Sequence, residues 1–189
     1  MIEESRRDFL RAVARDAAAR AMGLRSSPAA SPSAASAAQS APPAFSSSFE
    51  EISGLFVTWL KDGRPRGRSG TLAPDATLHA LVEKHAVAAL LHDPRVPPAA
   101  QKEFPRYSPR ISVLSLFEEM SGADGLIVGT HGVLAEKGKR TGIVLPEDAE
   151  GLGWDGVRLL GQACLRAGLP EESWRTGSVR LTRFESETF

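Results

Sequence analysis

Apolar residues near the start of the chain recur at every fourth position. One row is formed by Phe9, Val13, Ala17 and Ala21, and a second row lies directly beside it, at Leu10, Ala14, Ala18 and Met22. This spacing follows the turn of an α-helix with one apolar face. Ser5 with Asp8 has the form of an N-terminal cap, and Gly23 has the form of a C-terminal stop. We therefore expect a helix within residues 1–25 that packs against the rest of the protein.

The next patterned segment predicts a β-hairpin followed by a helix. Residues 54–60 are an apolar run rich in β-forming residues, and the Asp62-Gly63 pair that follows is a strong turn signal. Residues 64–72 are therefore expected to return as the second strand. A helical stripe follows at Leu78, Leu81, Val82, His85 and Ala89. The prolines of residues 93–98 end this helix, because proline cannot continue one.

The second half of the chain alternates irregularly between strand and helix patterns. Residues 110–117 predict a strand, residues 125–145 predict two strands with glycines at the corners, and residues 179–189 predict a closing strand. Between them, residues 155–168 fit a helix that ends at Gly168. A clear hairpin and this irregular order favour the α+β class over a parallel α/β sheet.

Residues 26–48 differ in composition from the rest of the chain. They contain only Ser, Ala, Pro, one Gln and one Phe, so they carry no charge and offer almost nothing to bury. Ordering such a segment would cost conformational entropy without compensation. We interpret it as a flexible linker between the helix of residues 1–25 and an α+β body that spans residues 49–189.

The charge balance and the search for targeting signals limit the binding partners and the cellular location that the sequence predicts. Lys and Arg number 23, as do Asp and Glu, so no global field attracts nucleic acid or an anionic membrane. No apolar run is long enough to span a bilayer. Residues 5–10 look like the start of a twin-arginine export signal, but the charges at Arg11, Arg15, Asp16 and Arg20 interrupt the apolar run that such a signal needs. A cytoplasmic protein is expected.

The sequence offers no metal site. Cys164 is the single cysteine, and its place in a helical apolar pattern indicates a buried, inert thiol. The histidines at positions 79, 85 and 92 are six and seven residues apart, whereas helical zinc ligands are about one turn apart. His85 falls on the apolar stripe, which is typical of a satisfied core histidine. We expect no metal and no cofactor.

The returning strand carries an unusual run of cations. Arg64, Arg66 and Arg68 would point to one side of a strand, with Pro65, Gly67 and Ser69 on the other side. Arginines, hydroxyls and glycines of this kind suit a phosphate or carboxylate, since glycine lets a ligand approach closely. The glycine spacing matches neither of the common nucleotide-binding loops. A solvated edge strand explains the same residues equally well.

Several separated segments resemble the AMMECR domain family. "GLFVTWLKDGRPRGRSGTL" at 54–72 is similar to the strand pair of that family, which runs G-x-F-V-T-L, a turn, and L-R-G-C-I-G-T. The resemblance continues, in the same order, at 93–98, 111–115, 142–147, 152–155, 166–174 and 183–189. The cysteine of the family motif falls on Arg68 and its isoleucine on Ser69. If that thiol were a nucleophile or ligand, this chain could not perform the same chemistry.

The resemblance implies a compact α+β domain with a main body, built on a mixed or antiparallel sheet, and a smaller lobe. It also implies an accessory or binding domain associated with a MEMO-type protein and a radical S-adenosylmethionine protein, the AmmeMemoRadiSam system. The candidate site for an anionic, nucleotide-like or carboxylate group comprises Arg66, Gly67, Arg68, Ser69, Gly70, Thr71, Asp93, Arg95 and His131. A hydrolase or transferase acting on a nucleotide-like or peptide substrate is an alternative, with Asp93 or His131 as acid or base. Nucleic-acid binding is a second alternative, for which the chain has few aromatic residues.

Overall fold

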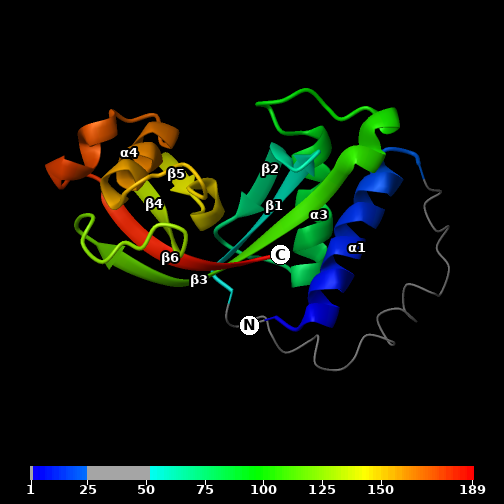
Figure 1. Cartoon of the computed structure of the whole chain (residues 1–189), viewed down its shortest axis with the longest axis horizontal. Coiled ribbons are helices and arrows are strands. Elements are labelled where there is room, and N and C mark those ends of the chain that lie inside the picture. The colour runs from blue at the N-terminus through cyan, green and yellow to red at the C-terminus, as the bar shows by residue number, and fades with distance from the viewer. Residues whose placement is uncertain (1, 25–51) are drawn as a thin grey trace. The chain divides into compact units, whose positions relative to one another are not determined.

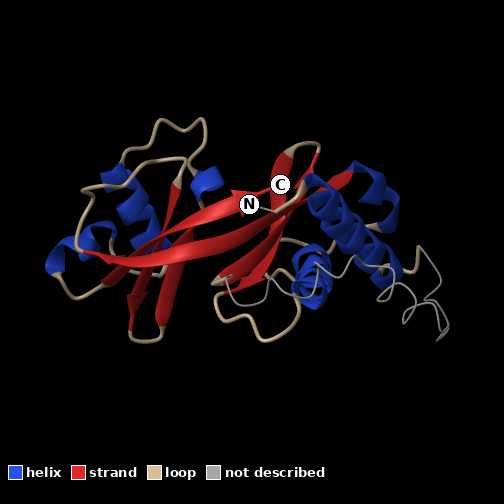
Figure 2. Cartoon of the chain, turned by 90° about the horizontal axis from the view of Figure 1, so that it is seen from below, coloured by secondary structure: helices blue, strands red, loops and turns tan. Residues whose placement is uncertain are grey.

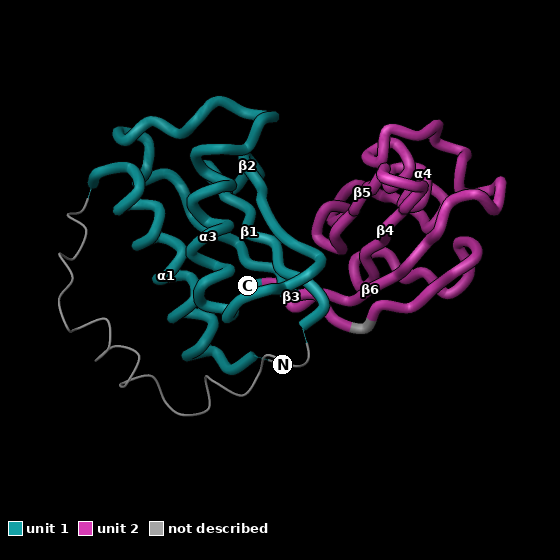
Figure 3. The backbone as a smooth tube through the Cα atoms, turned by 180° about the vertical axis from the view of Figure 1, so that it is seen from behind, with its two compact units in different colours: residues 1–113, 189 teal, residues 114–188 magenta. Residues whose placement is uncertain are grey.

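The computed structural model describes residues 2–24 and 52–189, which form two compact units (Figure 3). Unit 1 comprises residues 1–113 with Phe189, and unit 2 comprises residues 114–188. The predicted linker, residues 26–48, lies outside the described residues. Each unit combines helices with antiparallel strands, so the predicted α+β class is confirmed (Figures 1 and 2).

Unit 1 is a small sheet covered by two helices. Strands β1 (Gly54–Lys61) and β2 (Arg64–Thr71) form an antiparallel hairpin, and the sheet order is β2-β1-β3. Strand β3 (Tyr107–Met120) follows the short 3₁₀ helix η2 (Gln101–Arg106) and supplies its first half to this unit. Helix α3 (Leu78–Leu91) packs on β1 and β2, and helix α1 (Glu4–Ala21) packs on α3.

The hairpin forms where the turn signal predicts it. Asp62 has φ of 51° and Gly63 has φ of 77°, and a positive φ at both central residues gives the chain the reversal that matches the strand twist. Arg106 forms an ion pair with Asp62 and so ties η2 to the turn. The edge that carries the run of arginines is therefore fixed at its hairpin end.

Trp59 anchors α3 to the sheet of unit 1. Its indole is fully buried, and its Nε1 donates a hydrogen bond to the Ala86 carbonyl oxygen at 2.8 Å. The side chains of Phe104 and Tyr107 pack against the same ring. Burial of one large aromatic surface stabilises a fold by roughly 1.5–3 kcal/mol, so this contact sets how α3 lies over β2.

Helix α1 buries one of the two predicted apolar rows and lacks the predicted cap. In the other row, Phe9 and Ala21 are exposed. Leu10, Ala14 and Ala18 are buried and belong to the core of unit 1, as the four-residue spacing requires. The helix begins at Glu4, with Glu3 at the N-cap position and no side-chain cap bond, so the cap predicted at Ser5 is wrong. The predicted stop is confirmed, because Gly23 lies just beyond the helix with φ of 71°.

In unit 2, an α-helix that is longer than the two 3₁₀ helices beside it packs on a set of antiparallel strands. The strand order is β3-β6-β4-β5, with β4 (His131–Lys137), β5 (Arg140–Val144) and β6 (Arg180–Thr188). Helix α4 (Gly156–Arg166) packs on β4 and β5, and Asp155 caps it by accepting a bond from the Arg158 N–H. The short 3₁₀ helices η3 (Pro146–Asp148) and η4 (Glu171–Thr176) flank α4. Cys164 of α4 is fully buried, as predicted.

Candidate functional site

The run of arginines does not lie on one face of β2, because the strand contains a β-bulge. Trp59 pairs with Gly67 and Leu60 pairs with Pro65, so Arg66 has no residue directly opposite it. One extra residue reverses the alternation of faces. Arg64 therefore falls on the α3 side of the sheet and Arg68 on the opposite side, and the prediction that they share a face is wrong. Gly67 and Ser69 do share a face, as predicted.

The glycines of β2 are required by packing within unit 1. A Cβ atom at Gly67 would lie 2.1 Å from the Ala89 carbonyl oxygen, which belongs to the backbone of α3. A Cβ atom at Gly70 would lie 2.3 Å from both the Leu55 carbonyl oxygen and the ring of Phe56. The atoms that lie close to Gly67 and Gly70 therefore belong to the protein itself. Thr71 ends the strand in a local turn with Ala73.

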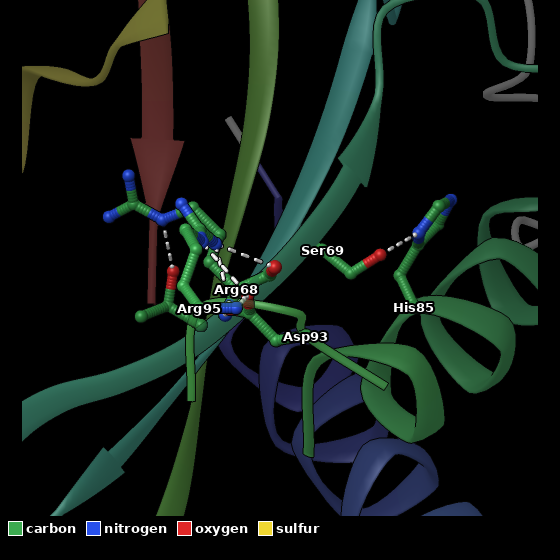
Figure 4. A network of polar contacts seen from close by, with 6 residues as sticks. Arg68, Ser69, His85, Asp93 and Arg95 are labelled. Atoms are coloured by element: carbon green, nitrogen blue, oxygen red, sulfur yellow. Dashed lines mark hydrogen bonds and ion pairs between the residues drawn. The ribbon is translucent and has the colours of Figure 1, made fainter. Parts of the chain in front are cut away.

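The loop of residues 93–97 follows the outer edge of β2. Arg68 donates its backbone N–H to Asp93 Oδ2 at 2.8 Å, and its carbonyl oxygen accepts a bond from Arg95 Nη2 at 3.0 Å. Two residues earlier on the strand, Arg66 Nη2 donates to the Pro97 carbonyl oxygen at 3.2 Å. The structure thus brings Arg68 together with Asp93 and Arg95 (Figure 4), and Arg66 contacts the same loop at Pro97.

Asp93 fixes the guanidinium of Arg95 in one orientation. Arg95 donates to Asp93 Oδ1 from Nε at 2.8 Å and from its backbone N–H at 3.0 Å, and Nη2 donates to Oδ2 at 2.8 Å. The Asp93 side chain is 1% exposed, while that of Arg95 is 65% exposed. This is a buried carboxylate that holds a cation toward solvent.

The same contacts determine the protonation of Asp93. The hydrogen bonds from the Arg95 side chain hold its pKa well below the ordinary value of 3.8, although burial acts in the opposite direction, and the N–H groups of Arg68 and Arg95 lower it further. A general acid or base works best with a pKa near the working pH. The geometry therefore suits Asp93 to positioning Arg95 more than to the proton transfer considered from the sequence.

Uncompensated positive charge gathers at the hairpin end of this edge. A shallow, open hollow is lined by Lys61, Asp62, Arg64, Pro65 and Arg66. Lys61 pairs with Glu103 at 2.7 Å and Asp62 pairs with Arg106, so these charges are balanced. Arg64 and Arg66 have no ion pair with a carboxylate among the residues that the structure describes.

A polar pair that the sequence did not reveal lies on the α3 side of β2. Ser69 Oγ and His85 Nδ1 are 2.9 Å apart, and Figure 4 shows the two side chains pointing toward each other, away from Arg68. His85 is only 6% exposed, so its predicted place in the core is confirmed, but of its two ring nitrogens only Nδ1 has a hydrogen-bond partner among the described residues. Its Nε2 is buried and has no hydrogen-bond partner among the described residues. Ser69 lies two residues after Gly67 and so points to the same, helix-facing side of β2. This spacing is the sequence signal from which the pair could have been predicted.

His85 makes the stability of unit 1 sensitive to acid. Burial lowers its pKa below the ordinary value of 6.5, with Lys84 adding to this effect and Asp75 opposing it. Since the unfolded chain takes up this proton first, stability should fall as the pH drops below 6.5, by at most about 1.4 kcal/mol per pH unit. Urea unfolding at pH 7.5 and 5.5 measures the loss. His85→Gln should show a smaller pH dependence than the native chain, and an identical one would contradict the assignment.

His131 belongs to unit 2 and is occupied in a local turn. It begins β4, and its Nδ1 accepts a hydrogen bond from the Ile127 N–H at 3.0 Å. Its backbone N–H donates to the Ile127 carbonyl oxygen at 2.8 Å, and Gly129 provides the positive φ of the turn. These contacts give His131 a structural role, in accord with a turn histidine between two glycines.

Residues 2–24 and 52–189 contain neither a cluster of metal ligands nor a membrane-spanning helix. No cluster of three or more His, Cys, Asp or Glu residues there has the arrangement of a metal site. None of the helices in that part is both long and apolar enough to cross a membrane.

Comparison with known proteins gives a consistent result over most of the chain. The model of the AMMECR1 family matches residues 12–189. A protein of Methanosarcina barkeri is 31% identical over 146 residues, covering 75% of this chain and 72% of its own length. A protein of Thermofilum pendens is 36% identical over 163 residues, with 75% and 74% covered.

A solved structure has the same fold. The crystal structure of the uncharacterized protein PH0010 from Pyrococcus horikoshii is similar with a TM-score of 0.82 and 27% sequence identity. The similarity covers 99% of this chain and 92% of that one.

Proposed function

The chain belongs to the AMMECR1 family, and we propose that it acts as a binding domain whose unit 1 holds the carboxylate or phosphate group of an anionic ligand. One observation carries this proposal. Buried Asp93 and the Arg68 carbonyl oxygen fix the guanidinium of Arg95, which nevertheless remains 65% exposed. A cation held in one orientation loses less conformational entropy when it binds an anion.

The charge of the surrounding edge supports the same ligand class. Arg64 and Arg66 form no ion pair with a carboxylate among the residues that the structure describes, and Arg66 contacts the loop that carries Arg95. Arginine binds carboxylate and phosphate through paired N–H groups, so planar or tetrahedral anions fit better than a neutral ligand. Partners of the MEMO and radical S-adenosylmethionine types, which the family resemblance implies, form part of this proposal.

Titration calorimetry with citrate, pyrophosphate and ATP tests the site directly. Arg95→Ala is expected to weaken binding about tenfold or more, since hydrogen bonds to charged groups contribute roughly 1.5–3 kcal/mol. Arg66→Ala should weaken binding less, because a hydrogen bond to the Pro97 carbonyl oxygen restricts the Arg66 side chain less than the several bonds restrict Arg95. Raising the salt concentration should weaken binding further.

Arg140→Ala is the matched control for this experiment. Arg140 is an exposed arginine of unit 2 that donates to the Gly168 carbonyl oxygen, so its removal costs one charge without touching β2. Its anion affinity should equal that of the native chain. The proposal fails if none of the three anions binds, or if Arg95→Ala binds as well as Arg140→Ala.

A further inference from the structure

We propose that Ser69 is a nucleophile activated by His85, and that this pair hydrolyses small carboxylic esters. The two side chains lie 2.9 Å apart, from Oγ to Nδ1, on the face of β2 opposite to Arg68 (Figure 4). A serine hydroxyl becomes a nucleophile when an adjacent base accepts its proton. This inference is independent of the anion site, because it uses the other face of the strand.

His85 has the properties of the base. It is 6% exposed on α3, and burial keeps its pKa below 6.5, so the imidazole is neutral at pH 7. A neutral imidazole with its hydrogen on Nε2 offers the lone pair of Nδ1 to the Ser69 hydroxyl. The charged groups that act on the ring are Lys84, which favours the neutral form, and Asp75, which favours the protonated form.

The backbone of β2 supplies a donor beside the nucleophile. Arg68 directs its N–H and its carbonyl oxygen away from β1, toward Asp93 and Arg95. In an antiparallel pair this direction repeats at every second residue, so the Gly70 N–H also faces the open edge. The N–H of the residue that follows a nucleophilic serine is a common oxyanion donor. Ser69 itself is partly exposed, and the proposal requires that an ester reach Oγ from that side.

The reaction proceeds in two balanced steps. Ser69 Oγ attacks the ester carbon while its proton passes to His85 Nδ1, and the Gly70 N–H stabilises the negative oxygen that develops. The bond to the alcohol oxygen then breaks, and the alcohol leaves with the proton from Nδ1. Water next attacks the acyl carbon and gives a proton to Nδ1, which returns it to Ser69 Oγ as the carboxylic acid departs.

A fluorophosphonate probe and p-nitrophenyl acetate test the pair in the full chain. Peptide mass spectrometry should find the probe attached to Ser69, and Ser69→Ala should abolish both this adduct and ester hydrolysis. His85→Gln can still hydrogen bond but cannot act as the base, so both rates should fall about 100-fold or more. The native rate should rise with pH through an inflection below 6.5, where His85 loses its proton.

Ser186→Ala is the control, because the Ser186 hydroxyl belongs to β6, hydrogen bonds with the Thr188 hydroxyl and takes no part in the Ser69–His85 pair. Its rates should match those of the native chain. No adduct on Ser69 in the native chain, or a native rate in folded His85→Gln, would overturn the proposal. If His85→Gln fails to fold, the native pH profile decides, and a rate that stays constant from pH 5 to 7.5 overturns it equally.

Discussion

Gly67→Ala is expected to lower the free energy of unfolding by about 3 kcal/mol, the upper part of the range for overpacking a dense core. The new methyl group would lie 2.1 Å from the Ala89 carbonyl oxygen and 3.3 Å from the Ala89 carbonyl carbon. Both atoms belong to the backbone of α3, which cannot rotate away as a side chain would. The helix must therefore shift on β2. Urea unfolding followed by circular dichroism measures the loss.

Gly122→Ala is the matched control for this substitution. Nothing lies within 4 Å of a Cβ atom at Gly122, and its φ is not in the left-handed region, so the same added methyl group meets open space. Its effect should stay within about 0.5 kcal/mol, as for other surface substitutions. Equal stability of the two variants would show that α3 does not contact β2 as described.

The sequence predicted the elements of this fold well and their local details less well. Glycine and aspartate at turns have direct geometric consequences, and the positive φ values at Gly23, Gly63 and Gly168 lie where helix ends and the hairpin were expected. The bulge at Arg66 could not be predicted from the sequence in this way. The position of one extra residue in a strand pair depends on how both strands fit α3. The arginine pattern therefore predicted one cationic face where there are two.

The candidate site was predictable in part for the same reason. The loop that follows α3 is short, so it was expected to lie near β2, the strand that α3 covers. Asp93 and Arg95 of this loop do contact Arg68 of β2. His131 was added from its place between glycines, but its turn lies in the other unit. The Ser69–His85 pair was missed because its two members lie in separate patterns, a strand alternation and a helical stripe, whose relative register only the packing defines.

The two faces of β2 separate the functions that the sequence left open. The edge with Arg66, Arg68 and Arg95 is the anion site that we propose, but arginine cannot accept a proton at neutral pH. The α3 side has a hydroxyl and a neutral imidazole, which is the chemistry a hydrolase requires. A variant at Arg95 should therefore alter anion affinity without altering labelling of Ser69, and a variant at His85 should do the reverse.

Asp93→Ala is expected to lower the free energy of unfolding by about 2 kcal/mol at pH 7. It removes the acceptor for the Arg68 N–H and for three donors of Arg95, and an unsatisfied group of this kind costs about 1–3 kcal/mol. The larger cost of breaking a fully buried pair does not apply, since the 65% exposed Arg95 side chain can regain water. Urea unfolding of both chains measures the difference.

The pH dependence of that difference identifies its cause. Because the pKa of folded Asp93 lies below the 3.8 of the free side chain, its contribution is fully present above about pH 5 and is lost as the pH falls toward the folded value. The stability gap between the native chain and Asp93→Ala should thus be constant from pH 7 to 5 and shrink at pH 3. Glu119→Ala, which breaks an exposed pair with Arg180, should cost at most about 1 kcal/mol. A gap for Asp93→Ala no larger than this, or one that persists unchanged at pH 3, would mean that the carboxylate does not hold the edge of β2 through its charge.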